Sequence, residues 1–117
     1  MSYVDGYVIP VPEANFDKYG SMAKTMAGLM KENGALKVVE SWADDVPEGK
    51  VTSFTMAVKR EAHEKVVFSF VIWPSKEVRD VGMKKVMEDP RMQQDMSQMP
   101  FDGQRMIWGG FKPFVEL

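Results

Sequence analysis

The stretch VVFSFVIW, residues 66–73, decides how the rest of the chain is interpreted. Successive side chains of a strand point to opposite faces, and here both alternating sets are apolar except at Ser69. Apolar residues on both faces are typical of a strand that is covered on both sides. We therefore predict a central strand at residues 66–73.

Three other segments have the residue types of strands. Residues 3–11 are rich in Tyr, Val and Ile and are followed by Pro12, which cannot donate a hydrogen bond to a sheet. Residues 36–43 and 105–115 are predicted to be the second and the last strand. Residues 52–59 alternate apolar and smaller or polar side chains, which favours a further short strand.

Helical periodicity is clearest in the first half of the chain. Apolar residues three and four apart predict a helix over residues 16–33, with Asn15 as its N-cap and Gly34 as a left-handed stop. A second helix is predicted over residues 75–89, because a serine opens it and the residue before Pro90 is disfavoured in a helix. The Asp-Pro pair at its end also suits the start of a new short helix.

The order strand, helix, strand, strand, helix, strand is the ferredoxin-like βαββαβ pattern of the α+β class, built on an antiparallel sheet. We expect one domain spanning residues 1–117, with the first and third strands in the centre and the fourth beside the first. The helices cover one face of such a sheet. Because neither face of the strand at residues 3–11 is polar, a homodimer that joins two sheets is expected to cover the other face.

Composition excludes several classes of protein. The 117 residues include no cysteine and one histidine, so we expect no metal and no organic cofactor. The 15 basic and 17 acidic residues are interspersed and give a formal net charge of -2, which argues against nucleic acid as a partner. No apolar run is long enough for a membrane span, and the first residues do not have the pattern of an export signal. The expected location is the cytoplasm.

Five segments together resemble a known family in order and spacing. They are YVDGYVIPVP, KENGALKVVESWADDVPEGK, PSKEVRD, EDPRM and MPFDGQRMIWGGF. The chain is similar over nearly its whole length to the YbaA-like family of small bacterial proteins, a domain of unknown function (1428). The resemblance implies a ferredoxin-like subunit of the dimeric α+β barrel type. That wider group includes cofactor-free monooxygenases, isomerases, haem enzymes and proteins of unknown role, so the fold leaves function open.

Asp5 is the most informative acidic residue, because it lies between Tyr3 and Tyr7 on one face of a strand that is expected to be central. A buried carboxylate needs a partner. If the last strand runs antiparallel beside the first, Arg105 supplies one, and the pair is either structural or catalytic. We favour the structural ion pair.

Arg79 falls within an apolar arc of its helix, where an arginine could bind an anionic ligand. The favoured alternative is a salt bridge with Asp80, Glu77 or an acid of a neighbouring element. Glu40 lies on the same face of its predicted strand as Trp42, and it too has either a functional or a structural role. That strand is expected to lie nearer the edge of the sheet, where the carboxylate can remain in solvent.

Three further features have a functional and a structural interpretation. His63 lies in a highly charged stretch and is expected in an exposed connection rather than in a catalytic cleft. The pair Gly109 and Gly110 lacks the context of a phosphate-binding loop and more plausibly permits a bulge or a close backbone approach. The eleven methionines suit core packing, or a pocket for a flexible apolar ligand.

Two functions remain open, and whether the protein is an enzyme is undecided. The first is binding, or slow conversion, of a small organic molecule in a pocket between sheet and helices. The second is a non-catalytic dimeric interaction or stress-related protein. A pocket with Asp5 or Arg79 unpaired would support the first, and a filled core with both saturated would support the second. The candidate ligand-binding residues are Asp5, Tyr7, Trp42, Arg79, Arg105 and Trp108.

Overall fold

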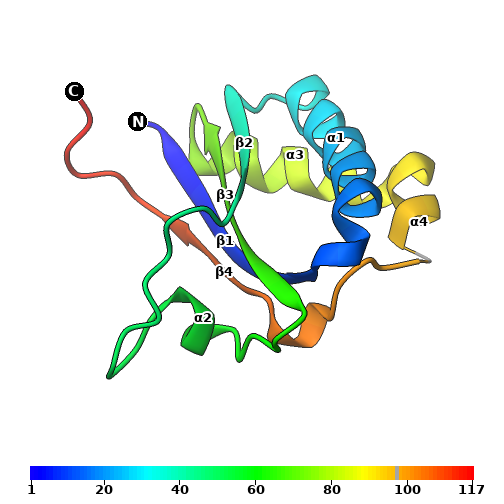
Figure 1. Cartoon of the computed structure of the whole chain (residues 1–117). Coiled ribbons are helices and arrows are strands. Elements are labelled where there is room, and N and C mark those ends of the chain that lie inside the picture. Colours follow the sequence, from blue (N-terminus) through cyan, green and yellow to red (C-terminus); the bar gives the residue numbers. More distant parts are fainter. Residues whose placement is uncertain (97) are drawn as a thin grey trace.

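Four antiparallel strands form one sheet in the order β2-β3-β1-β4 (Figure 1). The strands are β1 (Tyr3–Pro12), β2 (Lys37–Trp42), β3 (Glu64–Trp73) and β4 (Ile107–Phe111). β1 and β3 are central, and β2 and β4 form the edges. This is the ferredoxin-like arrangement, and it confirms the central position predicted for residues 66–73.

The structure is a computed structural model. It describes the backbone of residues 1–96 and 98–117 and the side chains of residues 1–93 and 98–117. Within these residues, no helix combines the length and the hydropathy that crossing a bilayer requires.

Helices lie mainly on one side of the sheet. Figure 1 shows α1 (Phe16–Glu32), α3 (Lys76–Glu88) and α4 (Pro90–Met96) together on that side, with α3 and α4 directly consecutive in the chain. The short helix α2 (Phe54–Ala57) lies apart from them, in the long connection between β2 and β3. Because α1, α3 and α4 all cover the same face, the opposite face of the sheet is largely open.

The predicted ends of the helices are mostly found. Gly34 follows α1 with a φ of 111°, and the Ser75 hydroxyl accepts a hydrogen bond from the backbone of Val78 at the start of α3. Asn15 precedes α1 but makes no side-chain cap. Its Nδ2 instead donates to the carbonyl of Pro100 at 2.9 Å, which ties the start of α1 to the segment before β4.

Two strand predictions are wrong. Residues 52–59 contain α2 instead of a strand, because the Ser53 hydroxyl caps a helical turn by accepting from the backbone of Met56 at 3.0 Å. The strand predicted over residues 105–115 is shorter at both ends, because β4 begins at Ile107 and ends at Phe111. The Asp102 side chain accepts from the backbone of Gln104 and holds residues 103–105 in a 3-10 turn.

The core below the helices is centred on Trp73, which is completely buried at the end of β3. Gly82 of α3 packs directly on its ring. A Cβ at Gly82 would lie 2.8 Å from the indole and 2.6 Å from the carbonyl oxygen of Asn33. A second buried cluster, around Val11 and Tyr19, closes the other end of the helix layer.

The opposite face of the sheet is apolar and uncovered over much of its area. Phe68 is 44% exposed, Ile107 45% and Phe111 62%. α2 covers part of this face, because the ring of Phe54 packs edge-on against Phe68 with centroids 5.9 Å apart. The chain thus leaves a hydrophobic surface of the sheet exposed to solvent.

Candidate functional site

A cavity of about 440 Å³ lies between the sheet and the helices α1, α3 and α4. Its size is in the range of pockets that hold small organic ligands. The walls are mainly methionine, whose flexible and polarisable side chains adapt to irregular apolar shapes. Among the residues whose side chains the structure describes, eight methionines line the cavity: Met22, Met26, Met30, Met83, Met87, Met92, Met99 and Met106.

The floor of the cavity contains one row of residues that crosses all four strands. The register pairs Glu40 of β2 with Ser69 of β3, Ser69 with Tyr7 of β1, and Tyr7 with Trp108 of β4. Residues paired across antiparallel strands point to the same face, so all four side chains face the helices. The row places a carboxylate, two hydroxyls and an indole along the floor.

Glu40 is fixed in this row by two buried hydroxyl groups. Tyr19 of α1 donates to Oε1 of Glu40, and Ser69 donates to Oε2, each at 2.5 Å. Burial, followed by the negative charge of Glu40 and the hydrogen bond to it, raises the pKa of Tyr19 well above its ordinary value. Among the described residues, no cationic group forms an ion pair with Glu40.

Tyr7 lies beside this carboxylate in the middle of the floor. Burial is the main reason that its pKa rises to about 12, with a further contribution from the negative charge of Asp5. The Tyr7 hydroxyl therefore stays protonated at neutral pH. It has no hydrogen-bond partner among the side chains that the structure describes, so it is available to a ligand.

Asp5 is buried and fully paired, but its partner is not the predicted one. Nη2 of Arg79 lies 3.0 Å from Oδ1, Nε of Arg79 donates to both carboxylate oxygens, and Nε1 of Trp73 donates to Oδ2 at 3.1 Å. The predicted pair of Asp5 with Arg105 is wrong, because Arg105 lies before β4 in a turn. The salt bridge proposed for Arg79 as its structural role is found, and Nη1 also binds Asp80 at 2.7 Å.

Arg79 reaches Asp5 because the residue opposite Asp5 in β4 is a glycine. Gly110 of β4 pairs with Asp5, and a Cβ there would overlap the Arg79 guanidinium and the Tyr3 hydroxyl. The guanidinium also lies 4.8 Å from the centroid of the Tyr3 ring, at the distance of a cation-π contact. The close backbone approach expected at the glycine pair is thus confirmed at Gly110.

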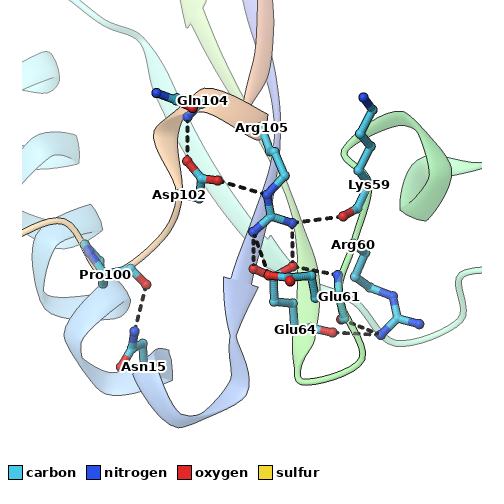
Figure 2. Close-up of polar contacts among 9 residues, drawn as sticks. All are labelled: Asn15, Lys59, Arg60, Glu61, Glu64, Pro100, Asp102, Gln104 and Arg105. Atoms are coloured by element: carbon cyan, nitrogen blue, oxygen red, sulfur yellow. Dashed lines mark hydrogen bonds and ion pairs between the residues drawn. The ribbon is translucent and has the colours of Figure 1, made fainter.

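Arg105 belongs to a separate polar cluster at the other end of the sheet (Figure 2). Its guanidinium binds both oxygens of buried Glu64 at 2.6 and 2.8 Å and reaches Asp102 at 3.0 Å and the carbonyl of Lys59 at 2.9 Å. The pKa of Glu64 lies below its ordinary value, mainly because of the hydrogen bonds from Arg105. This cluster joins the start of β3 to the turn before β4 and does not line the cavity.

One group of side chains has the spacing of a metal site, but its electrostatics are unfavourable. Ligand atoms of Glu61, His63 and Glu64 lie within 4.8 Å of one another. The two oxygens of Glu64 are already held by Arg105, whose positive charge opposes a bound cation. His63 is exposed, as the sequence predicts for a residue in a charged connection.

The two tryptophans among the candidates have different surroundings. Trp108 lines the cavity and is 63% exposed, so one part of the indole is open to solvent. Trp42 packs edge-on against Phe16 at 4.8 Å and is not part of the cavity lining. Asp5, Tyr7, Arg79 and Trp108 therefore share the cavity, whereas Trp42 and Arg105 lie outside it.

Glu40 is expected from the sequence to remain in solvent, and it is indeed exposed on β2. Two other polar residues of the cavity, Tyr19 and Ser69, are absent from the candidates predicted from the sequence. Two signals in the sequence point to them. Ser69 is the single polar residue in an otherwise apolar central strand, and Tyr19 is the one hydroxyl in the apolar arc of the first helix. A buried hydroxyl requires a partner, and Glu40 on the neighbouring strand supplies it for both.

The fold and the cavity define a class: a ferredoxin-like α+β domain with a ligand-sized pocket between its sheet and its helices. The chain belongs to the family described as "Protein of unknown function (DUF1428)", whose sequence profile matches residues 2–103. It is 56% identical over 116 residues to the "Uncharacterized protein YbaA" of Escherichia coli (strain K12), and the match covers 99% of each chain. The family resemblance predicted from the sequence is confirmed.

Solved structures share the fold at low sequence identity. A dimeric ferredoxin-like protein from an uncultured marine organism matches with a TM-score of 0.60 and 10% identity, over 99% of this chain and 98% of that chain. SnoaB, a cofactor-independent oxygenase from Streptomyces nogalater, matches with a TM-score of 0.58 and 12% identity, over 99% and 96%. At such identities the likeness establishes the fold alone.

Proposed function

We propose that this protein binds a small, largely apolar organic molecule in the methionine-lined cavity and either holds it or converts it slowly. The observation that carries this proposal is the combination of a 440 Å³ cavity with one polar row on its floor. A packed core has few voids larger than a water molecule, so an open space of this size suits a ligand. The row then provides the polar groups that orient a bound molecule.

Both alternatives predicted from the sequence receive support from particular residues. Asp5 and Arg79 are saturated by protein partners, which favours a structural role for that pair. The cavity beside them is nevertheless open, and Glu40 rather than Asp5 is the carboxylate without a cation. The structural neighbour that is a cofactor-independent oxygenase supports conversion of a ligand, since this fold accommodates such chemistry without a cofactor.

The proposal is tested by filling the cavity. Ala27 lines it from α1, whereas Lys24 is exposed on the same helix outside it, so Ala27→Trp and Lys24→Trp are matched variants. We expect mass spectrometry to find one small organic compound per chain in wild-type and Lys24→Trp protein purified from the host, and none in Ala27→Trp. The absence of any such compound, together with no uptake of the neutral probe naphthylethanol by wild-type protein, would contradict the proposal.

We also propose that the open face of the sheet joins two copies of the chain in a homodimer. The exposed side chains of Phe68, Ile107 and Phe111 support this, because apolar patches of this kind mark protein interfaces. The dimeric ferredoxin-like neighbour supports the same assembly. If the dimer alone is the function, the protein is the non-catalytic interaction or stress-related protein of the second hypothesis.

Light scattering during size-exclusion chromatography tests the dimer. Phe111→Lys places a charge on the open face, and Val81→Lys places one on the exposed outer side of α3, where Val81 is 57% exposed. We expect a mass of two chains for wild type and Val81→Lys and of one chain for Phe111→Lys. A wild-type monomer at micromolar concentration would contradict the dimer.

A further inference from the structure

The charged side chains that line the cavity are not balanced. Within the described part of the chain, they are Asp5, Glu40 and Arg79. Asp5 and Arg79 neutralise each other, and Arg79 has a second carboxylate partner in Asp80 outside the cavity lining. Glu40 receives hydrogen bonds from neutral hydroxyls only. The cavity lining therefore has one negative charge without a cation.

The protein holds this charge in a defined place. Tyr19 and Ser69 are both buried, with exposed fractions of 6% and 2%, and each donates to a different oxygen of Glu40. Glu40 itself is exposed on the edge strand β2, as the sequence predicts, and the two buried donors fix its carboxylate at the edge of the cavity floor. Each oxygen still has acceptor capacity after one hydrogen bond, so the carboxylate can accept further donors from a ligand.

Chemistry of the walls limits the rest of the ligand. Methionine side chains from α1, α3 and α4 surround the floor, and Trp108 lies at the opposite end of the row from Glu40. These surfaces suit an apolar or aromatic body. An anionic ligand would meet the charge of Glu40 without a free cation to compensate it, because Arg79 is already paired twice.

We infer that the cavity selects an apolar molecule that carries one protonated amine, and that Glu40 binds the ammonium group while the methionines hold the apolar body. The inference rests on the proposed function and deepens it by naming the chemical class of the ligand. Charge-assisted hydrogen bonds from an ammonium to a carboxylate are roughly twice as strong as neutral ones. An alcohol with the same apolar body would retain the apolar contacts and lose the charge-assisted hydrogen bonds to Glu40.

Three probes with one aromatic body test the inference by isothermal titration calorimetry: naphthylethylamine, naphthylethanol and naphthylacetate. We expect wild-type protein to bind the amine at least about tenfold more tightly than the alcohol, with the acetate weakest. Glu40→Gln should lower the affinity for the amine to that for the alcohol and leave the affinity for the alcohol unchanged. The matched control Glu88→Gln removes an exposed carboxylate outside the cavity and should change none of the three affinities.

A second variant retains the charge and changes only its orientation. Tyr19→Phe removes one donor to Glu40 and should reduce the preference for the amine without reversing it. Equal affinities for the amine and the alcohol, or tighter binding of the acetate, would overturn the selectivity for ammonium. The cavity proposal would still be supported if the probes bind to wild-type protein and do not bind to Ala27→Trp. No binding of any of the three probes to wild-type protein would overturn the selectivity for ammonium, and together with no host compound in mass spectrometry it would overturn the cavity proposal as well.

Discussion

Nη2 of Arg79 lies 3.0 Å from Oδ1 of Asp5, and this ion pair joins α3 to the central strand β1. Asp5 is only 2% exposed, and Trp73 at the end of β3 donates to its other oxygen. The three residues thus connect two central strands and one helix through a single carboxylate. The pair has a structural role beside the cavity, because neither partner retains an unpaired charge for a ligand.

Asp5→Asn is expected to destabilise the fold on the order of 3 kcal/mol, because it removes the buried negative charge that Arg79 requires. Combining Asp5→Asn with Arg79→Met should recover part of this loss, since the double variant buries neither charge. Urea denaturation of the two single variants and the double variant measures the coupling. Additive effects within about 0.5 kcal/mol would contradict a direct pair.

Asp80 provides the control for this cycle. It also contacts Arg79, at 2.7 Å, but its side chain is 46% exposed. Water replaces much of an exposed ion pair when it is lost. Asp80→Asn should therefore lower stability much less than Asp5→Asn. An equal effect would show that the Arg79 guanidinium depends as much on the exposed Asp80 as on the buried Asp5.

Glu64 should make stability depend on pH in the acidic range. Arg105 lowers the pKa of Glu64 in the folded protein below the ordinary value of 4.5, so the folded state binds this proton less readily than the unfolded state. The resulting stability is present above pH 4.5 and is lost as the pH falls through the folded-state pKa. Glu64→Gln should be less stable than wild type at neutral pH and lose less stability on acidification.

Denaturant unfolding at neutral and acidic pH measures this difference. The matched control is again Glu88→Gln, which removes an exposed carboxylate from the end of α3. We expect the pH dependence of that variant to follow wild type. Parallel pH curves for wild type and Glu64→Gln would mean that the Arg105 cluster contributes nothing to acid stability.

Much of the fold could be predicted because its signals are periodic. Residues 66–73 are apolar on both faces and are indeed central, and the helix predicted over residues 16–33 is found as α1. The prediction for residues 52–59 is wrong because one serine cap was enough to start a four-residue helix there. Short elements depend on single hydrogen bonds, which an alternation of side chains does not reveal.

The site could be predicted only in part, because its contacts join distant segments. Tyr7 and Trp108 are among the candidates predicted from the sequence, and they line the cavity as a pair across β1 and β4. The partner of Asp5 depends on the register that places Gly110 opposite it and lets Arg79 approach. The hydroxyls that bind Glu40 come from a helix and a neighbouring strand, and their convergence is a property of the tertiary fold.

Two glycines in helices should respond oppositely to replacement by alanine. Alanine favours a helix by about 1 kcal/mol over glycine at either position. Gly28 of α1 has open space around it, so Gly28→Ala should stabilise the protein. Gly82 of α3 packs on Trp73 and on the backbone of Asn33, so Gly82→Ala should cost about 1–3 kcal/mol through overpacking. Thermal unfolding of both variants measures the contrast, and equal shifts would mean that α3 moves away from Trp73 without cost.

Tyr7 should make the fold sensitive to alkaline pH. Burial raises its pKa from 10.0 to about 12, so the folded state retains a proton that the unfolded state loses first. The stability contributed by the neutral hydroxyl is full below pH 10 and is lost as the pH rises through about 12. Tyr7→Phe removes this group, and its stability should decline less steeply above pH 10 than that of wild type.

Denaturant unfolding across the alkaline range tests this expectation, with ultraviolet absorbance as an independent record of tyrosinate formation. Tyr19→Phe should flatten the same alkaline decline, because burial and Glu40 also raise the pKa of Tyr19. Lysine deprotonation in the same range affects all variants alike, so the comparison between variants isolates the tyrosines. If Tyr7→Phe and wild type lose stability in parallel above pH 10, the Tyr7 hydroxyl is hydrated through the cavity, and the cavity floor is more polar than its burial implies.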